Sequence, residues 1–235
     1  YFFVSASLQD SLRRYLKNHG SFEHLSGKVA IHLNDTHPAL AVPEMMRLLV
    51  DEHHLEWDVA WDQCQRIFSY TNHTLMSEAL ETWPVDLMGR LLPRHLRIIY
   101  DLNARFLAEV HDRFPNENDL LRRISLIDEH GQRRVRMAYL SVLASHKING
   151  VSALHSDLMV KTIFADFARL WPERFNNKTN GITPRRWLSQ ANRPLSALID
   201  ARIGITWRRH LDELSALRPL ADDPEFQSAF RLAKT

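Results

Sequence analysis

The sequence predicts an α/β fold, in which a largely parallel sheet with flanking helices is followed by a helical segment. A short β-rich run, a polar turn and a helix follow one another four times along the chain. Strands that are separated by helices are joined by crossover connections, which make neighbouring strands parallel. Beyond Gly204 the pattern becomes helical and irregular, with no further strand of this kind.

The first two instances of this pattern lie in the N-terminal third of the chain. Residues 28–33 form the first β-rich run, and Pro43 opens the helix that follows. Proline suits a first helical turn because its missing N–H would have no partner there. Residues 66–71 form the second run, and a short helix through Glu78 and Leu80 comes after its turn.

A long helical stretch separates the second instance from the third. Pro93 opens it, and apolar residues then recur at helical spacing at Leu96, Ile99, Leu102, Phe106 and Val110. A second helix is predicted over about residues 133–146. The third instance combines a strand over 147–151 with a helix over about 152–167.

The fourth instance marks a predicted domain boundary. Residues 175–180 form its strand, and the following helix is capped by Thr183 and opened by Pro184. We place the boundary near residue 180. It divides the chain into an α/β part, 1–179, and a helical part, 180–235.

Composition and charge exclude several classes of protein. Of 235 residues, 45% are hydrophobic and 25% charged, and the formal net charge is only +2. Basic residues are scattered among acidic ones, so no nucleic-acid surface is predicted. No apolar run approaches the roughly 20 residues that cross a bilayer, so no membrane span is predicted.

The single cysteine and the two chain ends carry further expectations. Cys64 has no partner for an internal disulfide, which fits a reducing cytoplasm. Its apolar neighbours favour a buried thiol over a nucleophile. The chain opens with Tyr1-Phe-Phe-Val4 and closes with Phe230-Arg-Leu-Ala-Lys-Thr235 in a helical pattern, so we expect a fragment.

The candidate site lies in the turns that follow the predicted strands, because open parallel sheets bind ligands outside the carboxyl ends of their strands. These turns are Asn34-Asp35-Thr36-His37, Asn72-His73-Thr74, Gly150-Val151 and Asn180-Gly181. They supply a carboxylate, imidazoles, amides and hydroxyls, which suit the hydroxyl groups of a sugar. No turn is rich in glycine or lysine, as a phosphate cradle would be. The alternative is that each residue is an ordinary turn, cap or structural histidine.

Other polar groups suggest weaker alternatives. His53 and His54 lack a third ligand at metal spacing, so no metal site is predicted. Glu78 or Glu81 is a candidate partner for Asp35 as a glycosidase-type acid and base, although Glu78 also suits the first turn of its own helix.

Two Trp-Pro pairs interrupt the helical pattern. Trp83-Pro84 and Trp171-Pro172 are expected to mark helix ends, each with a buried indole ring.

Five longer motifs resemble one known family. They are Lys28-Val-Ala-Ile-His-Leu-Asn-Asp-Thr-His-Pro38, Tyr70-Thr-Asn-His-Thr74, Glu78-Ala-Leu-Glu-Thr-Trp-Pro84, Leu92-Pro-Arg-His-Leu96 and Asn177-Lys-Thr-Asn-Gly-Ile-Thr-Pro-Arg-Arg-Trp187. Together they are similar to the α-glucan (glycogen or maltodextrin) phosphorylases, and the resemblance spans nearly the whole chain.

The resemblance implies part of a two-domain glycosyltransferase B-type fold, with residues 1–179 from the N-terminal domain and 180–235 from the start of the C-terminal one. Members of the family transfer the terminal α-1,4-linked glucosyl unit of a glucan to inorganic phosphate, giving glucose 1-phosphate with retention. Their cofactor is pyridoxal 5'-phosphate, which works through its phosphate group. The resemblance also implies a cytoplasmic, allosteric enzyme of carbohydrate metabolism that is homodimeric at full length.

Individual residues match the family's motifs. Asp35 matches an acidic residue beside the glucosyl pocket, and His73 a histidine whose main-chain carbonyl lies near the glucosyl ring. His37 matches a histidine at the pocket edge, and Val151 matches a wall of the pocket. Asn180 matches an asparagine that binds the sugar's hydroxymethyl group, and Trp187 a tryptophan near the cofactor.

A second set of matches concerns a surface helix. In some relatives the corresponding stretch stores glucan away from the active site, and the matching residues here are Tyr100, Asn103, Glu129 and Arg133. Asn103 is followed by Ala104 where a polar residue would be expected. An ordinary amphipathic helix is the alternative.

The departures from the family concern the cofactor. The family's Glu-Ala-Ser-Gly-Thr…Lys context is absent, and Lys147 and Lys178 stand in other motifs. The lysine that binds the cofactor is therefore expected outside this sequence, and the chain alone is expected to be inactive. Two alternatives remain: a non-catalytic glucan-binding module, and a retaining glycosidase that uses Asp35 and Glu78.

Overall fold

The computed structural model describes residues 1–234 and divides into two compact units, Tyr1–Thr179 and Asn180–Thr235. Each is treated separately below. Their assignment to the N-terminal and C-terminal domains of a longer protein stays a prediction.

A four-stranded sheet lies at the centre of the first unit. Its strands are β1 (Ile31–Asn34), β2 (Phe68–Thr71), β6 (Lys147–Gly150) and β7 (Phe175–Asn177), in the spatial order β1-β2-β6-β7. All three neighbouring pairs are parallel. The α/β class and the largely parallel sheet are thus confirmed.

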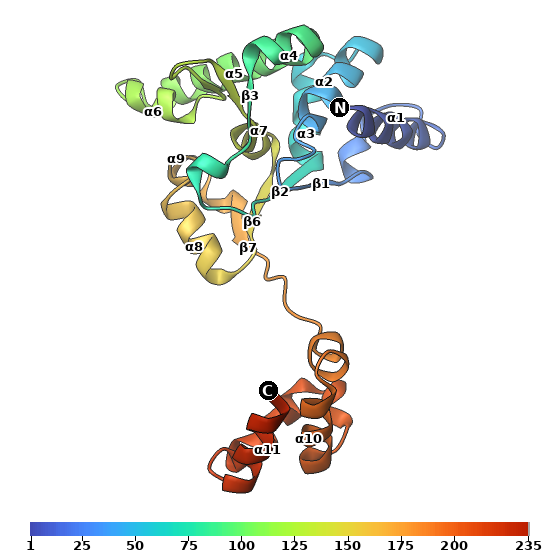
Figure 1. Ribbon diagram of the computed structural model, residues 1–235. Helices are drawn as coiled ribbons and strands as arrows, with labels where there is room; N and C mark the ends of the chain where they lie inside the picture. Colours follow the sequence, from blue (N-terminus) through green and yellow to red (C-terminus); the bar gives the residue numbers. More distant parts are fainter. Residues whose placement is uncertain (235) are drawn as a thin grey trace. The chain divides into compact units, whose positions relative to one another are not determined.

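Helices provide the crossovers between these strands, and one further helix, α1 (Phe2–Leu16), precedes β1. The crossover helices are α2 (Ala41–Arg47), α3 (Trp57–Ile67), α4 (Val85–Leu91), α5 (Pro93–Arg113), α6 (Asn118–Ile124), α7 (Met137–Ala144), α8 (Ala153–Lys161) and α9 (Ala165–Leu170). In Figure 1, α8 and α9 lie beside β6 and β7, whereas α2 and α3 lie on the side of β1 and β2.

The core forms where these helices pack on the sheet. Leu33, Phe68, Tyr70 and Ile148 of the strands are completely buried. Helix α5 begins at Pro93, as predicted, and all five of the predicted apolar positions along it are buried. The helical period read from the sequence therefore identified the face of α5 that packs against the core.

A second, antiparallel sheet was not predicted. It consists of β3 (Thr82–Pro84), β5 (Arg134–Arg136) and β4 (Ile127–Asp128) in that spatial order. Trp83 lies on β3 with 42% of its surface exposed, so the prediction of a buried ring there was wrong. Trp171, at the end of α9, is only 8% exposed, as predicted.

Several predicted helices have other bounds. The helix expected over 152–167 is two helices, α8 and α9, and the one expected over 133–146 begins only after β5. The segment around Glu78 is a three-residue 3-10 turn, Ser77–Ala79. Helix α2 starts at Ala41 rather than Pro43, which places the proline inside its first turn.

The second unit is helical, as the sequence predicts for this segment. It contains α10 (Arg193–Ile203), α11 (Pro224–Lys234), a π-helical turn over Arg185–Gln190 and 3-10 turns. Trp207 is buried at its centre, and its indole N–H donates to Asp200 Oδ1 at 3.0 Å. This buried ring gives the small unit a core of its own.

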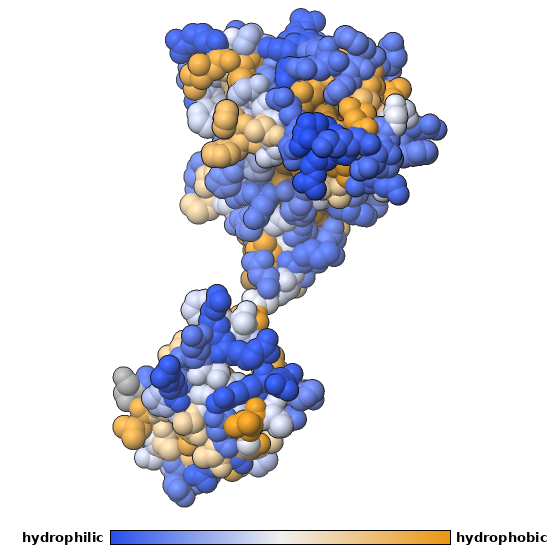
Figure 2. Space-filling view, turned by 90° about the vertical axis from the view of Figure 1, so that its right-hand side faces the viewer, coloured by the Kyte–Doolittle hydropathy of each residue, from blue (hydrophilic) through white to orange (hydrophobic). Residues whose placement is uncertain are grey.

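The exposed face seen in Figure 2 is mostly hydrophilic, with hydrophobic side chains in separate patches. Within residues 1–234, every helix is too short or too polar to cross a lipid bilayer.

Candidate functional site

The carboxyl ends of the four parallel strands lie level with one another. Asp35, Asn72, Val151 and Lys178 each follow directly on one of the strands β1, β2, β6 and β7. We call the turns that begin at these four residues the strand-end rim. Backbone hydrogen bonds extend the sheet ladder into it, from Asp35 N–H to the Thr71 carbonyl (2.9 Å), from Asn72 N–H to the Asn149 carbonyl (3.0 Å) and from Lys178 N–H to the Gly150 carbonyl (3.1 Å).

This ladder brings three of the predicted site residues, Asp35, His73 and Val151, onto one edge of one sheet. They are separated by up to 116 positions in the sequence. Their side chains follow adjacent strands, so they lie within the span of a few strand spacings of about 4.8 Å each. That span matches the size of a monosaccharide or a short oligosaccharide.

Asp35 occupies an unusual backbone conformation. Its φ is +61°, in the left-handed region that aspartate and asparagine tolerate better than other side chains. Its Oδ1 accepts the backbone N–H of Thr36 at 2.6 Å, and the buried hydroxyl of Thr36 donates to Glu81 Oε2. Glu81 also accepts the indole N–H of Trp83 at 2.8 Å. The carboxylates of Asp35 and Glu81 therefore both stabilise the first turn of the rim.

His73 is exposed on the second turn and hydrogen-bonds to the first. Its Nε2 lies 2.7 Å from Asn34 Oδ1, so this nitrogen donates to the amide oxygen. His37 is exposed on the turn that leads into α2. The two histidines therefore stand on neighbouring turns of the rim.

Behind the rim, a chain of polar side chains crosses three strands. Thr71 donates its hydroxyl proton to Asn149 Oδ1 at 2.8 Å, so its oxygen accepts from Nε2 of His32. Nδ1 of His32 then accepts from the Ser69 hydroxyl at 2.8 Å. Burial lowers the pKa of His32, and His73 lowers it further, which favours the neutral ring that this chain requires. The sequence analysis did not identify this network, although polar residues inside apolar strands were its visible signal.

Two predicted site residues belong to the second unit and are described within it. Asn180 is exposed at its start, directly before Gly181, whose φ is +67°. Trp187 lies on the π-helical turn with 68% of its surface exposed.

The residues predicted to contact stored glucan lie apart from the rim. A cavity of about 590 Å³ beside α5 is lined by Tyr100, Asn103 and Glu129, whereas Arg133 is not among its lining residues. Asn103 is 9% exposed, and its Oδ1 accepts the backbone N–H of Leu126 at 2.7 Å. Asn103 therefore also has a structural role, joining α5 to the segment before β4.

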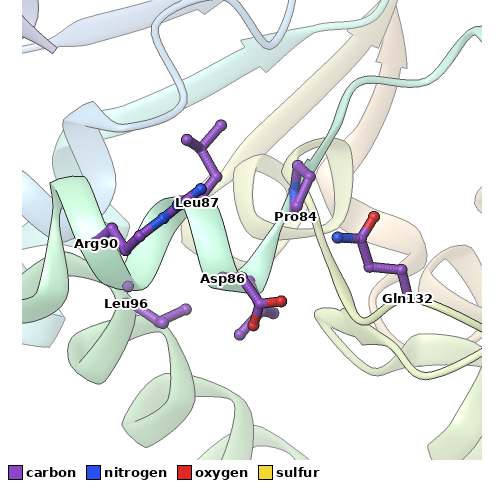
Figure 3. A pocket seen from close by; sticks show the side chains of 8 residues that line it. Pro84, Asp86, Leu87, Arg90, Leu96 and Gln132 are labelled. Carbon is purple, nitrogen blue, oxygen red and sulfur yellow. The ribbon is translucent and has the colours of Figure 1, made fainter.

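A larger cavity, of about 730 Å³, contains none of the predicted site residues. It is lined by α4, the start of α5 and the loop before β5. Figure 3 shows Asp86 and Gln132 beside this space. The polar side chains of its lining are those of Asp86, Arg90 and Gln132, which belong to no motif singled out in the sequence analysis.

Lys147 and Lys178, the two lysines named in the sequence analysis, differ in their surroundings. Lys147 Nζ donates to the Glu173 carbonyl at 2.8 Å. Lys178 is exposed on the rim, in the Asn-Lys-Thr-Asn motif.

Cys64 is completely buried, as predicted, and burial raises the pKa of its thiol. Among residues 1–234, no three His, Cys, Asp or Glu side chains are grouped as a metal site would require.

Comparison with known proteins identifies close relatives. The family model of the carbohydrate phosphorylases matches residues 1–235. A glycogen phosphorylase from Haemophilus influenzae is 59% identical over 229 residues, which are 97% of this chain and 28% of the relative. One from Synechocystis is 55% identical over 94% of this chain and 26% of its own length. The muscle form from Mus musculus is 50% identical over 96% of this chain and 28% of its own length. The chain thus spans little more than a quarter of each relative.

Proposed function

Because the chain belongs to the carbohydrate phosphorylase family, we propose that it forms part of a glucan phosphorylase. The full-length protein transfers the terminal α-1,4-linked glucosyl unit of a glucan to inorganic phosphate and releases glucose 1-phosphate with retention. The observation that supports this most is the strand-end rim, where Asp35, His73 and Val151 follow adjacent parallel strands.

The rim residues have distinct roles in this proposal. The Asp35 carboxylate and the main-chain carbonyl of His73 stabilise the positive charge that develops on the glucosyl ring as its bond to the glucan breaks. His37 lines the edge of the pocket and Val151 forms its wall. By its motif match, Asn180 selects the hydroxymethyl group of the sugar by hydrogen bonding.

The remaining parts of the active centre belong to other residues of the same protein. We propose that pyridoxal phosphate is bound by a lysine outside this sequence, with Trp187 near it. When bound, the cofactor would supply a phosphate group that can exchange a proton with the substrate phosphate. The partners are an α-1,4-glucan, inorganic phosphate and a second copy of the full-length chain, and the single buried Cys64 fits a cytoplasmic location.

A second glucan contact is proposed beside α5. The cavity lined by Tyr100, Asn103 and Glu129 offers an aromatic ring, an amide and a carboxylate, which are groups that bind sugars. Arg133 belongs to the same proposal through its motif match. The alternative is an ordinary amphipathic helix. A Tyr100→Ala variant separates the two: the proposed contact predicts a weaker affinity for glycogen, and the alternative predicts an unchanged one.

The test of the main proposal is a comparison of the 235-residue chain with the full-length protein. We expect glucose 1-phosphate from maltooligosaccharide and phosphate with the full-length protein only, because the chain lacks the cofactor lysine. Release of glucose 1-phosphate by the chain alone contradicts the proposal that the cofactor lysine lies outside this sequence. Sugar release by the full-length protein without phosphate supports a glycosidase that uses Asp35 and Glu78 instead.

A further inference from the structure

The turn between β6 and α8 is packed too tightly for any side chain on Gly150. A Cβ atom there would lie 2.4 Å from Ser156 Oγ, 2.6 Å from His155 Nδ1 and 2.8 Å from Ser156 Cα. The last of these atoms belongs to the backbone of α8, which cannot give way easily. The first turn of α8 therefore rests directly on the end of β6, next to Val151.

His155 closes this turn with two hydrogen bonds. Its backbone N–H donates to Oγ of Ser152, the N-cap residue of α8, at 3.1 Å. Its side chain turns back, and Nδ1 accepts the backbone N–H of Val151 at 3.3 Å. The pair resembles a capping box, in which the third helical residue returns a bond to the backbone at the start of the helix. The backbone of Val151 is thus attached to α8 as well as to β6.

The Val151 bond requires a neutral imidazole with its proton on Nε2, because Nδ1 is the acceptor. Burial lowers the pKa of His155, and the nearby His73 lowers it further, so the neutral ring predominates at neutral pH.

Packing alone does not explain a histidine at this position. Nε2 of His155 is buried and has no hydrogen-bond partner among residues 1–234. A buried donor without a partner is unfavourable, and a leucine would occupy similar space without one. The contact that the ring supplies and a leucine would not is the one to Val151.

We propose that His155 is a positioning residue of the glucosyl pocket, where its Nδ1 holds the Val151 wall in register with the rest of the rim. The inference rests on the proposed function, since it assigns a purpose to the wall of that pocket. His155 does not touch the sugar in this account. It acts through the backbone of Val151 alone.

The test compares two replacements in the full-length protein. His155→Leu preserves bulk and removes the acceptor, whereas His155→Asn places Oδ1 near the position of Nδ1 and preserves it. We expect kcat/KM for phosphorolysis to fall about tenfold in the leucine variant, because a displaced pocket wall misaligns the glucosyl unit. The asparagine variant should recover most of this loss. His111→Leu, at an exposed position near the end of α5, controls for the loss of a histidine.

A second measurement tests the hydrogen bond between the Val151 N–H and His155 Nδ1 directly. Site-resolved hydrogen exchange should show a faster Val151 amide in the leucine variant and a protected one in wild type and the asparagine variant. Equal kcat/KM in wild type and the leucine variant, or equal losses in both variants, overturns the inference. If the wild-type protein performs no phosphorolysis, the proposed function is refuted instead, and the positioning role of His155 is refuted with it.

Discussion

We expect the Asp35→Asn variant of the full-length protein to release glucose 1-phosphate about 100-fold more slowly than wild type, with kcat rather than KM carrying most of the loss. Asparagine accepts the left-handed backbone that Asp35 adopts at a φ of +61° and keeps an oxygen for the Thr36 N–H. The substitution therefore removes the negative charge and little else. Steady-state kinetics in the direction of phosphorolysis measure the effect.

Alanine at the same position is a poorer test. A residue with a Cβ and no polar side chain loses roughly 1 kcal/mol in the left-handed region, so Asp35→Ala would confound strain with the loss of charge. The asparagine variant should unfold at the wild-type temperature. If it also retains the wild-type kcat, Asp35 has no electrostatic role in the reaction.

The second large effect concerns stability and a buried carboxylate. Glu44 of α2 has no exposed surface, and it accepts hydrogen bonds from Ser5 of α1 (2.6 Å), Arg47 (2.8 Å) and His95 of α5 (2.6 Å). Glu44→Gln leaves Arg47 without its buried partner. We expect the free energy of unfolding in urea to fall by about 3–5 kcal/mol, the range typical of a broken buried pair.

A matched control lies on the same arginine. Glu52 binds Arg47 at 2.7 Å but is 53% exposed, so Glu52→Gln should lower the stability by less than about 1 kcal/mol. Equal losses in the two variants would mean that burial adds nothing to the Glu44 pair.

The same cluster determines how stability depends on pH. Burial raises the pKa of Glu44, but hydrogen bonds from Arg47, Ser5 and His95 together bring it below its ordinary value of 4.5. Burial lowers the pKa of His95 below 6.5, and the Glu44 carboxylate offsets this only in part. The unfolded chain therefore binds more protons than the folded one as the pH falls. The stability that the cluster contributes is complete above about pH 6.5 and declines as the pH falls below it. The Glu44→Gln variant removes the part of this pH dependence that lies below pH 4.5.

The order of the elements was largely readable from the sequence, because it depends on local signals. Pro93 and the apolar spacing after it identified α5, and the four β-rich runs became the four parallel strands. The antiparallel sheet was missed because its strands have two or three residues, too few for a period. Its pairing of Trp83 with Val135 joins positions far apart in the sequence.

The candidate site was predictable to the extent that it depends on topology. Parallel strands place their carboxyl ends together, so Asp35, His73, Val151 and Asn180 were expected on one edge. The first three follow adjacent strands, whereas β7 ends at Asn177 and Asn180 belongs to the second unit. The part played by His155 was not read from the sequence, since a side chain that returns to the backbone depends on atomic geometry. The Gly150-Val-Ser-x-x-His155 spacing, a capping-box pattern after a glycine, was the available signal.

The central claim is that the strand-end rim forms the wall of a glucosyl pocket. A crystal structure of the full-length protein with a bound maltooligosaccharide tests it most directly. The account predicts a terminal glucosyl ring against the turns that contain Asp35 and His73, with Val151 in van der Waals contact. A sugar bound only in the cavity beside α5, with the rim occupied by other side chains of the protein, would contradict it.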